Sequence, residues 1–288
     1  MRHLTKHLVA ETDFLWANVG AGITDAGVVL IDCPVRPSDS RQWQKELQAL
    51  SPKGIRYRIS TDYHGDHTIG SAFIEDERVI SVAPQRVFEE LSKTDGSSLT
   101  GRETFINTMN DIEKPDEANE IAEAVLPLPQ VCFEKGMTLH LPPLTFEIHC
   151  LGGHTPACSS VYVPEEGVIF TSDVVINEPG PGMREAIFQQ WIKGLEWIES
   201  LDVAYVVPGH GEICGIEEVR KFKNNFVEMW GLMKDLLDKG RDKETATADT
   251  VFEKFFWSDT SRGESWIEHR RRTFQKGLEN LYTEVKGG

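Results

Sequence analysis

Short apolar runs, separated by Gly, Pro and acidic residues, dominate the first three quarters of the chain. They predict two strands within 14–32 and further strands around 56–60, 78–82, 137–142, 145–151, 159–163 and 167–172. Apolar residues at helical spacing instead predict helices over 38–50, 84–93 and 184–200. This alternation of strands and helices is typical of a mixed α/β fold.

Beyond residue 215 the apolar positions recur three and four residues apart, as in Phe222, Phe226 and Trp230. This spacing predicts helices over 216–239, 246–257 and 264–285. We therefore expect one domain with a core over 1–215 and an all-helical C-terminal extension over 216–288.

An insertion at about 94–135 interrupts the core with a loop, T-D-G-S-S-L-T-G-R, and two short acidic helical patterns. It could line a cleft or pack on the outside of the core. The extension could likewise be a lid, an oligomer contact or a flank, and the pattern does not decide between these roles.

Metal-competent side chains cluster in the segment S-T-D-Y-H-G-D-H-T-I-G (60–70), directly after a predicted strand. Asp62, His64, Asp66 and His67 fall within six positions, and a spacing of two points Asp62 and His64 the same way. The adjacent Asp66 and His67 can turn toward a second point nearby. A polar turn is the simpler interpretation of this segment alone, but two neighbouring metals could be served by one such loop.

Three later segments favour the metal interpretation, since each is an apolar run that delivers one metal-competent side chain at its end. His154 follows a glycine pair in L-G-G-H-T-P, Asp173 ends the run V-I-F-T-S-D, and His210 lies in the turn P-G-H-G. A single core histidine usually packs by hydrogen bonding. Repetition at four strand ends indicates a metal site.

The series D-x-H-x-D-H, G-G-H-T-P, S-D and P-G-H-G resembles the metallo-β-lactamase superfamily, over residues 15 to 215 or so. The resemblance implies a four-layer αβ/βα sandwich with two metals at one edge of its sheets. It also implies a ligand set: His64 and His154 with position 62 for the first metal, Asp66, His67 and His210 for the second, and Asp173 as the bridge.

Asp62 departs from the family signature H-x-H-x-D-H, because it stands where the first histidine is expected. It could coordinate the metal, it could lie behind the ligands and leave a weakened first site, or the site could be degenerate. A coordinating Asp62 would make the cluster about one charge unit less positive and shift its preference toward Mn²⁺ or Fe²⁺. We expect two divalent cations, with zinc first and iron or manganese as alternatives.

The expected activity is that of a metallo-hydrolase, in which a metal-bound hydroxide attacks a small ester, thioester, lactone or amide. Asp66 would assist the leaving group, and Tyr63 would donate a hydrogen bond to the oxyanion. An iron-dependent oxidoreductase that resembles the sulfur dioxygenases of the superfamily, with a single iron, is the first alternative. A non-catalytic binding protein on a degenerate scaffold is the second.

The composition and net charge of the chain limit the kinds of binding partner that we expect. The 288 residues carry a net charge of −16, and the only basic cluster is H-R-R-R (269–272), which argues against nucleic acid. No apolar run of membrane-spanning length occurs, and the N-terminus lacks the apolar stretch of a secretory signal, so we expect a cytoplasmic protein. Its five cysteines form no C-x-x-C pair and read as free thiols. A small-molecule substrate and a homodimer are consistent with these features.

Overall fold

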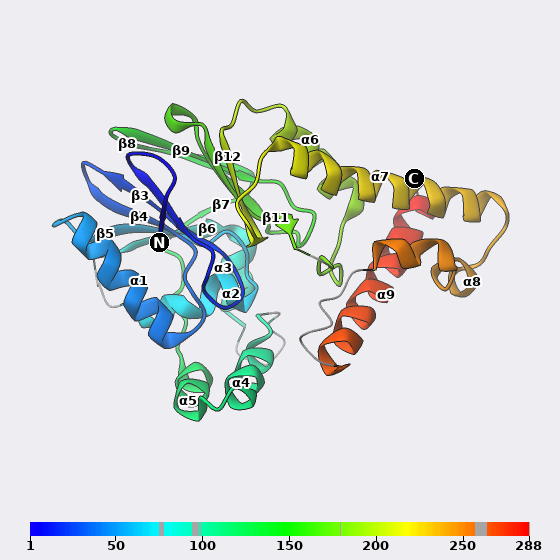
Figure 1. Cartoon of the computed structure of the whole chain (residues 1–288), viewed down its shortest axis with the longest axis horizontal. Helices are drawn as coiled ribbons and strands as arrows, with labels where there is room; N and C mark the ends of the chain where they lie inside the picture. The colour runs from blue at the N-terminus through cyan, green and yellow to red at the C-terminus, as the bar shows by residue number, and fades with distance from the viewer. Residues whose placement is uncertain (75–77, 94–97, 99, 179, 257–263, 288) are drawn as a thin grey trace.

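Two mixed β-sheets pack face to face in the computed structural model, which describes residues 1–74, 78–93, 98, 100–178, 180–256 and 264–287 (Figure 1). The first sheet has seven strands in chain order: β1 (Arg2–His3), β2 (Leu8–Glu11), β3 (Val19–Thr24), β4 (Gly27–Ile31), β5 (Ile55–Ile59), β6 (Ile80–Pro84) and β7 (Val131–Phe133). Strands β1 to β4 are antiparallel neighbours, and β4 to β7 are parallel.

The second sheet has five strands in the order β12 (Tyr205–Gly211), β11 (Val168–Asn177), β10 (Ser159–Val163), β9 (Leu144–Cys150) and β8 (Gly136–Leu141). Its neighbours are antiparallel except for the parallel pair β11 and β12. Buried side chains from both sheets, including Ile31, Phe146 and Phe170, form one apolar layer between them. A methyl group at Gly20 would lie 2.1 Å from the Phe170 ring, so only glycine permits this close approach.

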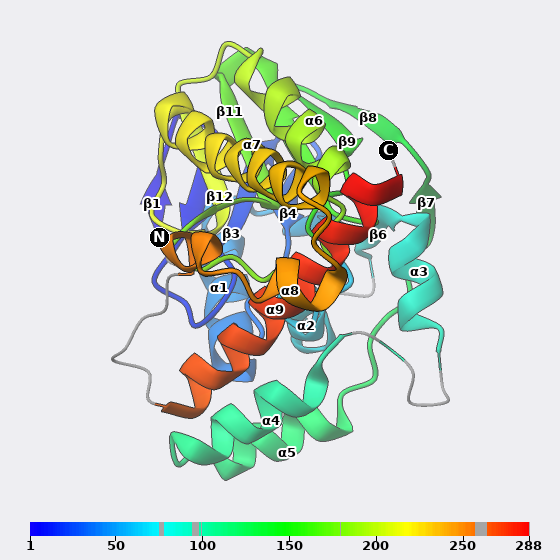
Figure 2. The ribbon, with the colours of Figure 1, turned by 90° about the vertical axis from the view of Figure 1, so that its right-hand side faces the viewer.

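Helices cover the outer faces of both sheets. Helix α1 (Pro37–Leu50) buries Trp43 and Leu47 against the seven-stranded sheet. Helices α6 (Phe188–Glu199) and α7 (Ile216–Asp238) lie over the five-stranded sheet, as Figure 2 shows. The four-layer αβ/βα sandwich expected from the resemblance is therefore confirmed, together with its helical extension.

Three short helical elements follow the strands of the first sheet. They are α2 (Gly65–Thr68), the 3₁₀ helix η1 (Ile69–Phe73) and α3 (Gln85–Leu91). Another 3₁₀ turn, η2 (Pro164–Glu166), joins β10 to β11. Helix α2 begins within the metal-competent segment itself, so the chain turns sharply between His64 and Asp66.

The expected strands and helices of the core are present, but three expectations need correction. The strands β1, β2 and β7 were not predicted, because each is a short run with no alternation to mark it. The predicted helix 246–257 is instead α8 (Lys243–Thr247) followed by the 3₁₀ helix η3 (Thr250–Phe255), with Asp249 accepting a hydrogen bond from Val251 N between them; residue 257 lies outside the described residues. Asp173 does not end its strand, since β11 continues to Asn177.

The insertion at 94–135 forms two helices, α4 (Arg102–Asp111) and α5 (Pro115–Glu123), below the sandwich in Figure 1. A forked ion pair joins α5 to the start of α1, with Arg36 Nε and Nη2 at 3.0 and 2.8 Å from Glu117 Oε1. Residues 94–97 and 99 of the predicted loop lie outside the described residues.

The C-terminal extension shares a hydrophobic core with the sandwich. Residues of β11 and α6 form one buried cluster with residues of α7, η3 and α9 (Glu264–Gly287). The rings of Trp191 in α6 and Phe226 in α7 pack together, with centroids 4.5 Å apart and planes tilted by 39°. No helix among the described residues is both long and apolar enough to cross a membrane.

Candidate metal centre

The segment after β5 is anchored from behind by Asp32. This residue follows β4 with a φ of 56°, a conformation that is uncommon outside glycine. Its carboxylate accepts hydrogen bonds from Thr61 N at 2.8 Å and from Thr61 Oγ1 at 2.5 Å. The backbone that leads into Asp62 is therefore fixed before the first metal-competent side chain.

Asp62, His64 and His154 form the first group whose donor atoms lie close enough together to hold a cation. His154 Nε2 lies 3.1 Å from His64 Nδ1. Asp62 is fully buried, and its carboxylate accepts hydrogen bonds from Tyr63 N at 2.6 Å and from Thr155 Oγ1 at 2.9 Å. These bonds fix the carboxylate beside the two imidazoles, so Asp62 is placed to serve as a ligand.

Asp66, His67 and His210 form the second group. His210 Nε2 lies 3.3 Å from Asp66 Oδ2. His67 is fully buried, and its Nδ1 lies 2.9 Å from Asp32 Oδ2. Asp32 therefore fixes the orientation of this ring and leaves Nε2 directed at the site.

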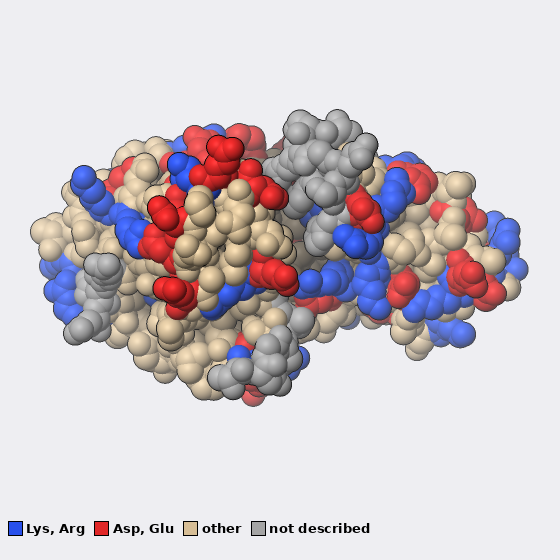
Figure 3. Space-filling model, turned by 90° about the horizontal axis from the view of Figure 1, so that it is seen from below, with Lys and Arg blue, Asp and Glu red and all other residues tan. Residues whose placement is uncertain are grey.

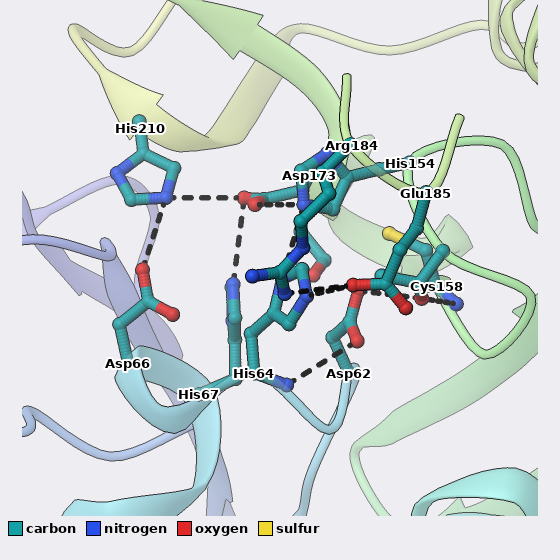
Figure 4. A network of polar contacts seen from close by, with 12 residues as sticks. Asp62, His64, Asp66, His67, His154, Cys158, Asp173, Arg184, Glu185 and His210 are labelled. Atoms are coloured by element: carbon teal, nitrogen blue, oxygen red, sulfur yellow. Dashed lines mark hydrogen bonds and ion pairs between the residues drawn. The ribbon is translucent and has the colours of Figure 1, made fainter. Parts of the chain in front are cut away.

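Asp173 lies between the two groups, as Figure 4 shows. Its Oδ2 is 3.2 Å from His154 Nε2 on one side. Its Oδ1 is 3.3 Å from His210 Nε2 and 3.4 Å from His67 Nε2 on the other. A methyl group at Gly209 would lie 2.0 Å from Oδ1, so the glycine of P-G-H-G lets β12 approach this carboxylate.

Charge interactions shift the pKa values of these groups strongly. Burial would lower the pKa of His210, but Asp173 and Asp66 outweigh it and raise that pKa to about 10. Burial would likewise lower the pKa of His67, yet Asp32 and Asp173 raise it well above its usual range. Burial would raise the pKa of Asp66, but the hydrogen bond from His210 and the charge of His67 lower it to about 2. These imidazoles and carboxylates thus stabilise one another as opposite charges in the metal-free chain.

The donor set suits a divalent transition metal. Each group offers two imidazoles and one carboxylate, which is the ligand chemistry of Zn²⁺, Fe²⁺ and Mn²⁺. His67 Nε2 and Asp173 Oδ1 are buried without a hydrogen-bond partner in the described part of the chain, although such groups normally have one. A cation between them would satisfy both atoms, so the residues fit the metals that the fold implies.

Glu185 supports the first group and was not anticipated from the sequence. Its Oε1 lies 3.1 Å from His64 Nε2, and its Oε2 accepts a hydrogen bond from the Tyr63 hydroxyl at 2.5 Å. The bond to Nε2 directs His64 Nδ1 toward the site.

The side chain of Tyr63 contacts Glu185 and is buried. Its side chain is 1% exposed, and it does not line the pocket that opens from the metal centre. Burial and the bond to Glu185 raise the pKa of its hydroxyl, which is committed to that carboxylate. Tyr63 therefore holds Glu185 in place, and its hydrogen bond to an oxyanion stays a prediction.

A cavity of about 190 Å³ opens directly from the metal centre, and Asp66, Asp173 and His210 line its base. Thr104 and Phe105 of α4 form part of its wall, so the insertion lines the cleft. Arg270 and Thr273 of α9 also line it, so the extension contributes to the site. The pocket thus contains residues of both the insertion and the extension, and an oligomer contact by the extension stays a prediction.

Comparison with known proteins identifies the family. The family model of the metallo-beta-lactamase superfamily matches residues 19–210. The metallo-beta-lactamase type 2 of Bacteroides fragilis is 27% identical over 215 residues, covering 72% of this chain and 74% of that protein. A linear primary-alkylsulfatase of Pseudomonas sp. is 23% identical over 220 residues, covering 68% of this chain but only 42% of that enzyme.

Solved structures share the fold. A metallo-beta-lactamase from Pontibacter korlensis superposes with a TM-score of 0.60 at 15% identity, covering 78% of this chain and 97% of that one. The sec-alkylsulfatase Pisa1 from Pseudomonas sp. superposes with a TM-score of 0.68 at 19% identity. The superposition covers 98% of this chain and 49% of the sulfatase chain. With the family model spanning most of the sandwich, this chain belongs to the metallo-β-lactamase superfamily.

Proposed function

We propose that this protein is a metal-dependent hydrolase that holds two divalent cations and cleaves a small ester, thioester, lactone or amide. The observation that carries the proposal is the position of Asp173, whose two carboxylate oxygens face separate groups of donors. Six further side chains complete these groups on either side, as the resemblance implies. A hydrolase is also consistent with the activities named for the β-lactamase and alkylsulfatase relatives.

The residues divide into two sets. The proposed ligands are Asp62, His64 and His154 for one cation, Asp66, His67 and His210 for the other, and Asp173 for both. Bound divalent cations supply Lewis acidity and lower the pKa of a coordinated water. Asp32, Thr155 and Glu185 hold the ligands in place through hydrogen bonds.

Asp66 is an acidic ligand placed to act on a substrate. It lines the pocket, and hydrogen bonding to His210 keeps its carboxylate ionised. In that form it can orient a water molecule or accept a proton at Oδ1. Trp16, Phe105 and Ile176 give the same pocket an apolar wall.

The experiment is a hydrolysis panel with the metal-loaded protein. Aryl esters, a thioester, a lactone and an anilide are compared for the wild type, Asp173→Asn and Asp13→Asn. Asp13 has a side chain that is 80% exposed, which makes it a matched control. We expect turnover of at least one class, a loss of about 100-fold or more in Asp173→Asn and none in Asp13→Asn. No turnover of any class by a protein that retains two metals would contradict the proposal.

Alkyl sulfate esters are a second candidate class of substrate. The curated alkylsulfatase relative favours them, although this chain spans less than half of that enzyme. Adding a primary alkyl sulfate to the panel, with release of inorganic sulfate as the readout, distinguishes sulfate-ester from carbonyl chemistry.

A further inference from the structure

The C-terminal helix α9 places the positively charged side chain of Arg270 beside the metal centre. Arg270 and Thr273 of α9 line the same pocket as His154 and Asp173. A methyl group at Gly182 would lie 3.3 Å from His154 Cε1 and 3.8 Å from Arg270 Nη1. The guanidinium and the imidazole therefore both lie close to Gly182, which lines the same pocket.

Two arginines reach this pocket of an acidic chain. The net charge is −16, yet Arg184 and Arg270 both line the cavity. Arg184 Nη2 donates to Glu185 Oε1 at 2.9 Å, so Arg184 is engaged in holding the carboxylate that supports His64. Figure 3 shows a hollow between the sandwich and the helical arm, with Lys and Arg atoms on the side of the arm and Asp and Glu atoms on the other side. Arg270 thus enters from α9 a pocket whose other charged side chains include the carboxylates of Asp66, Asp173 and Glu178.

An aromatic surface lines the same cavity. The rings of Trp16 and Phe105 meet edge to face, with centroids 5.0 Å apart. Trp16 has a φ of 76°, a conformation that is costly for a bulky residue and that is often found where a side chain is held for binding. This surface can accept an apolar group of a ligand.

We propose that Arg270 binds an oxyanion of the substrate, while the apolar part of the same molecule packs on Trp16 and Phe105. This inference rests on the proposed hydrolase function and names its substrate class as an ester, thioester, lactone or amide that also carries a carboxylate. The planar guanidinium of arginine matches a carboxylate with two parallel hydrogen bonds. Arg270 lies outside the segment 19–210 that the family model matches, so this specificity belongs to the C-terminal extension.

A binding experiment tests the inference without requiring turnover. The probes are 4-phenylbutyrate and its neutral amide, which share one shape, titrated calorimetrically into the metal-loaded protein. We expect the carboxylate to bind the wild type about tenfold or more tightly than the amide, because a hydrogen bond to a charged group contributes that much. Arg270→Ala should remove this preference, and Arg270→Lys should keep only part of it, since the charge remains but the fork is lost.

Arg272 provides the matched control. It lies two residues further along α9, is exposed, and lines a different cavity, so Arg272→Ala removes the same charge without touching the site. The carboxylate preference should be unchanged in this variant. The affinity for the amide reports on folding, and it should be the same in all variants.

Three results would overturn the inference: no preference for the carboxylate in the wild type, a preference that survives in Arg270→Ala, or an equal loss in Arg272→Ala. Survival in Arg270→Ala would mean that the anion binds at the metals. A 4-phenylbutane sulfonate probe then distinguishes a carboxylate substrate from an alkyl sulfate substrate. An alkyl sulfate would place its anionic group at the metals, so binding of the sulfonate would not change in Arg270→Ala. Because this experiment measures binding and not turnover, its failure is distinguishable from failure of the hydrolase proposal.

Discussion

Glu185 connects the pocket to the metal centre at the level of single atoms. Its carboxylate contacts His64 Nε2, the Tyr63 hydroxyl and the Arg184 guanidinium. Hydrogen bonds from His64 and Tyr63 outweigh burial and lower the pKa of Glu185 to about 2, so it is ionised at neutral pH. An ionised partner makes the His64 imidazole a stronger ligand.

Replacing Glu185 with Gln should therefore weaken the first metal site. We expect about a tenfold loss of affinity for one of the two cations, because loss of a supporting carboxylate typically costs that much. Competition with a chromophoric chelator measures the two affinities. Glu217→Gln is the control, since its carboxylate is 71% exposed and pairs only with Arg220 among the contacts described. Equal affinities in Glu185→Gln and the wild type would mean that the contact is incidental.

Metal binding should compete with protons at the second group. The pKa of His210 is raised to about 10 and that of His67 is also raised, so both imidazoles are protonated in the metal-free chain at pH 7. A cation must displace these protons, so the apparent affinity should rise with pH by about tenfold per unit for each proton released, up to the folded pKa. Calorimetric titration in two buffers of different ionisation enthalpy counts the protons released. Zero protons at pH 7 would refute the assigned charge states.

The seven proposed ligands could be predicted from the sequence, because each lies in a short motif beside an apolar strand. The supporting roles of Asp32 and Glu185 could not. Asp32 ends the run V-V-L-I-D and carried the same strand-end pattern, but nothing local linked it to His67. Glu185 has no sequence signal at all, since it meets His64 only through the long-range packing of the chain.

At the scale of elements, the packing of α6 against α7 holds the extension on the sandwich. Phe226 is 2% exposed and contacts the rings of Phe188, Trp191 and Phe222. The spacing of Phe222 and Phe226 predicted the helix correctly. Which partner its apolar face would meet was not predictable, because two helices can bury such faces in many ways.

Phe226→Ala should destabilise the protein by about 3–5 kcal/mol, since truncation of a buried aromatic ring leaves a cavity. Val227→Ala is the matched control: the adjacent side chain is 47% exposed and should change stability by less than about 0.5 kcal/mol. Urea unfolding followed by circular dichroism measures both. A difference between the two variants of less than about 1 kcal/mol would show that α7 is loosely packed.

At the scale of the whole molecule, the pocket is assembled from parts that lie far apart in the sequence. It is lined by residues of the loop after β5, of strands β11 and β12, of the insertion helix α4 and of the C-terminal helix α9. The motifs predicted the sandwich because they lie within residues 19–210, the segment that the family model matches. The roles of α4 and α9 depend on tertiary contacts, and no local pattern encodes them. The domain boundary at residue 215 stays a prediction, although the shared core cluster is consistent with one unit.

The central claim is that two neighbouring cation sites share Asp173 and that Asp62 is a ligand of the first. Elemental analysis of metal per chain, for the wild type, Asp62→Ala and the exposed control Asp13→Ala, tests it most directly. The account predicts two metals in the wild type and in Asp13→Ala, and one in Asp62→Ala, because the first group then keeps only two imidazoles. One metal in all three proteins would contradict it, and would place Asp62 outside the coordination sphere of a single-metal site.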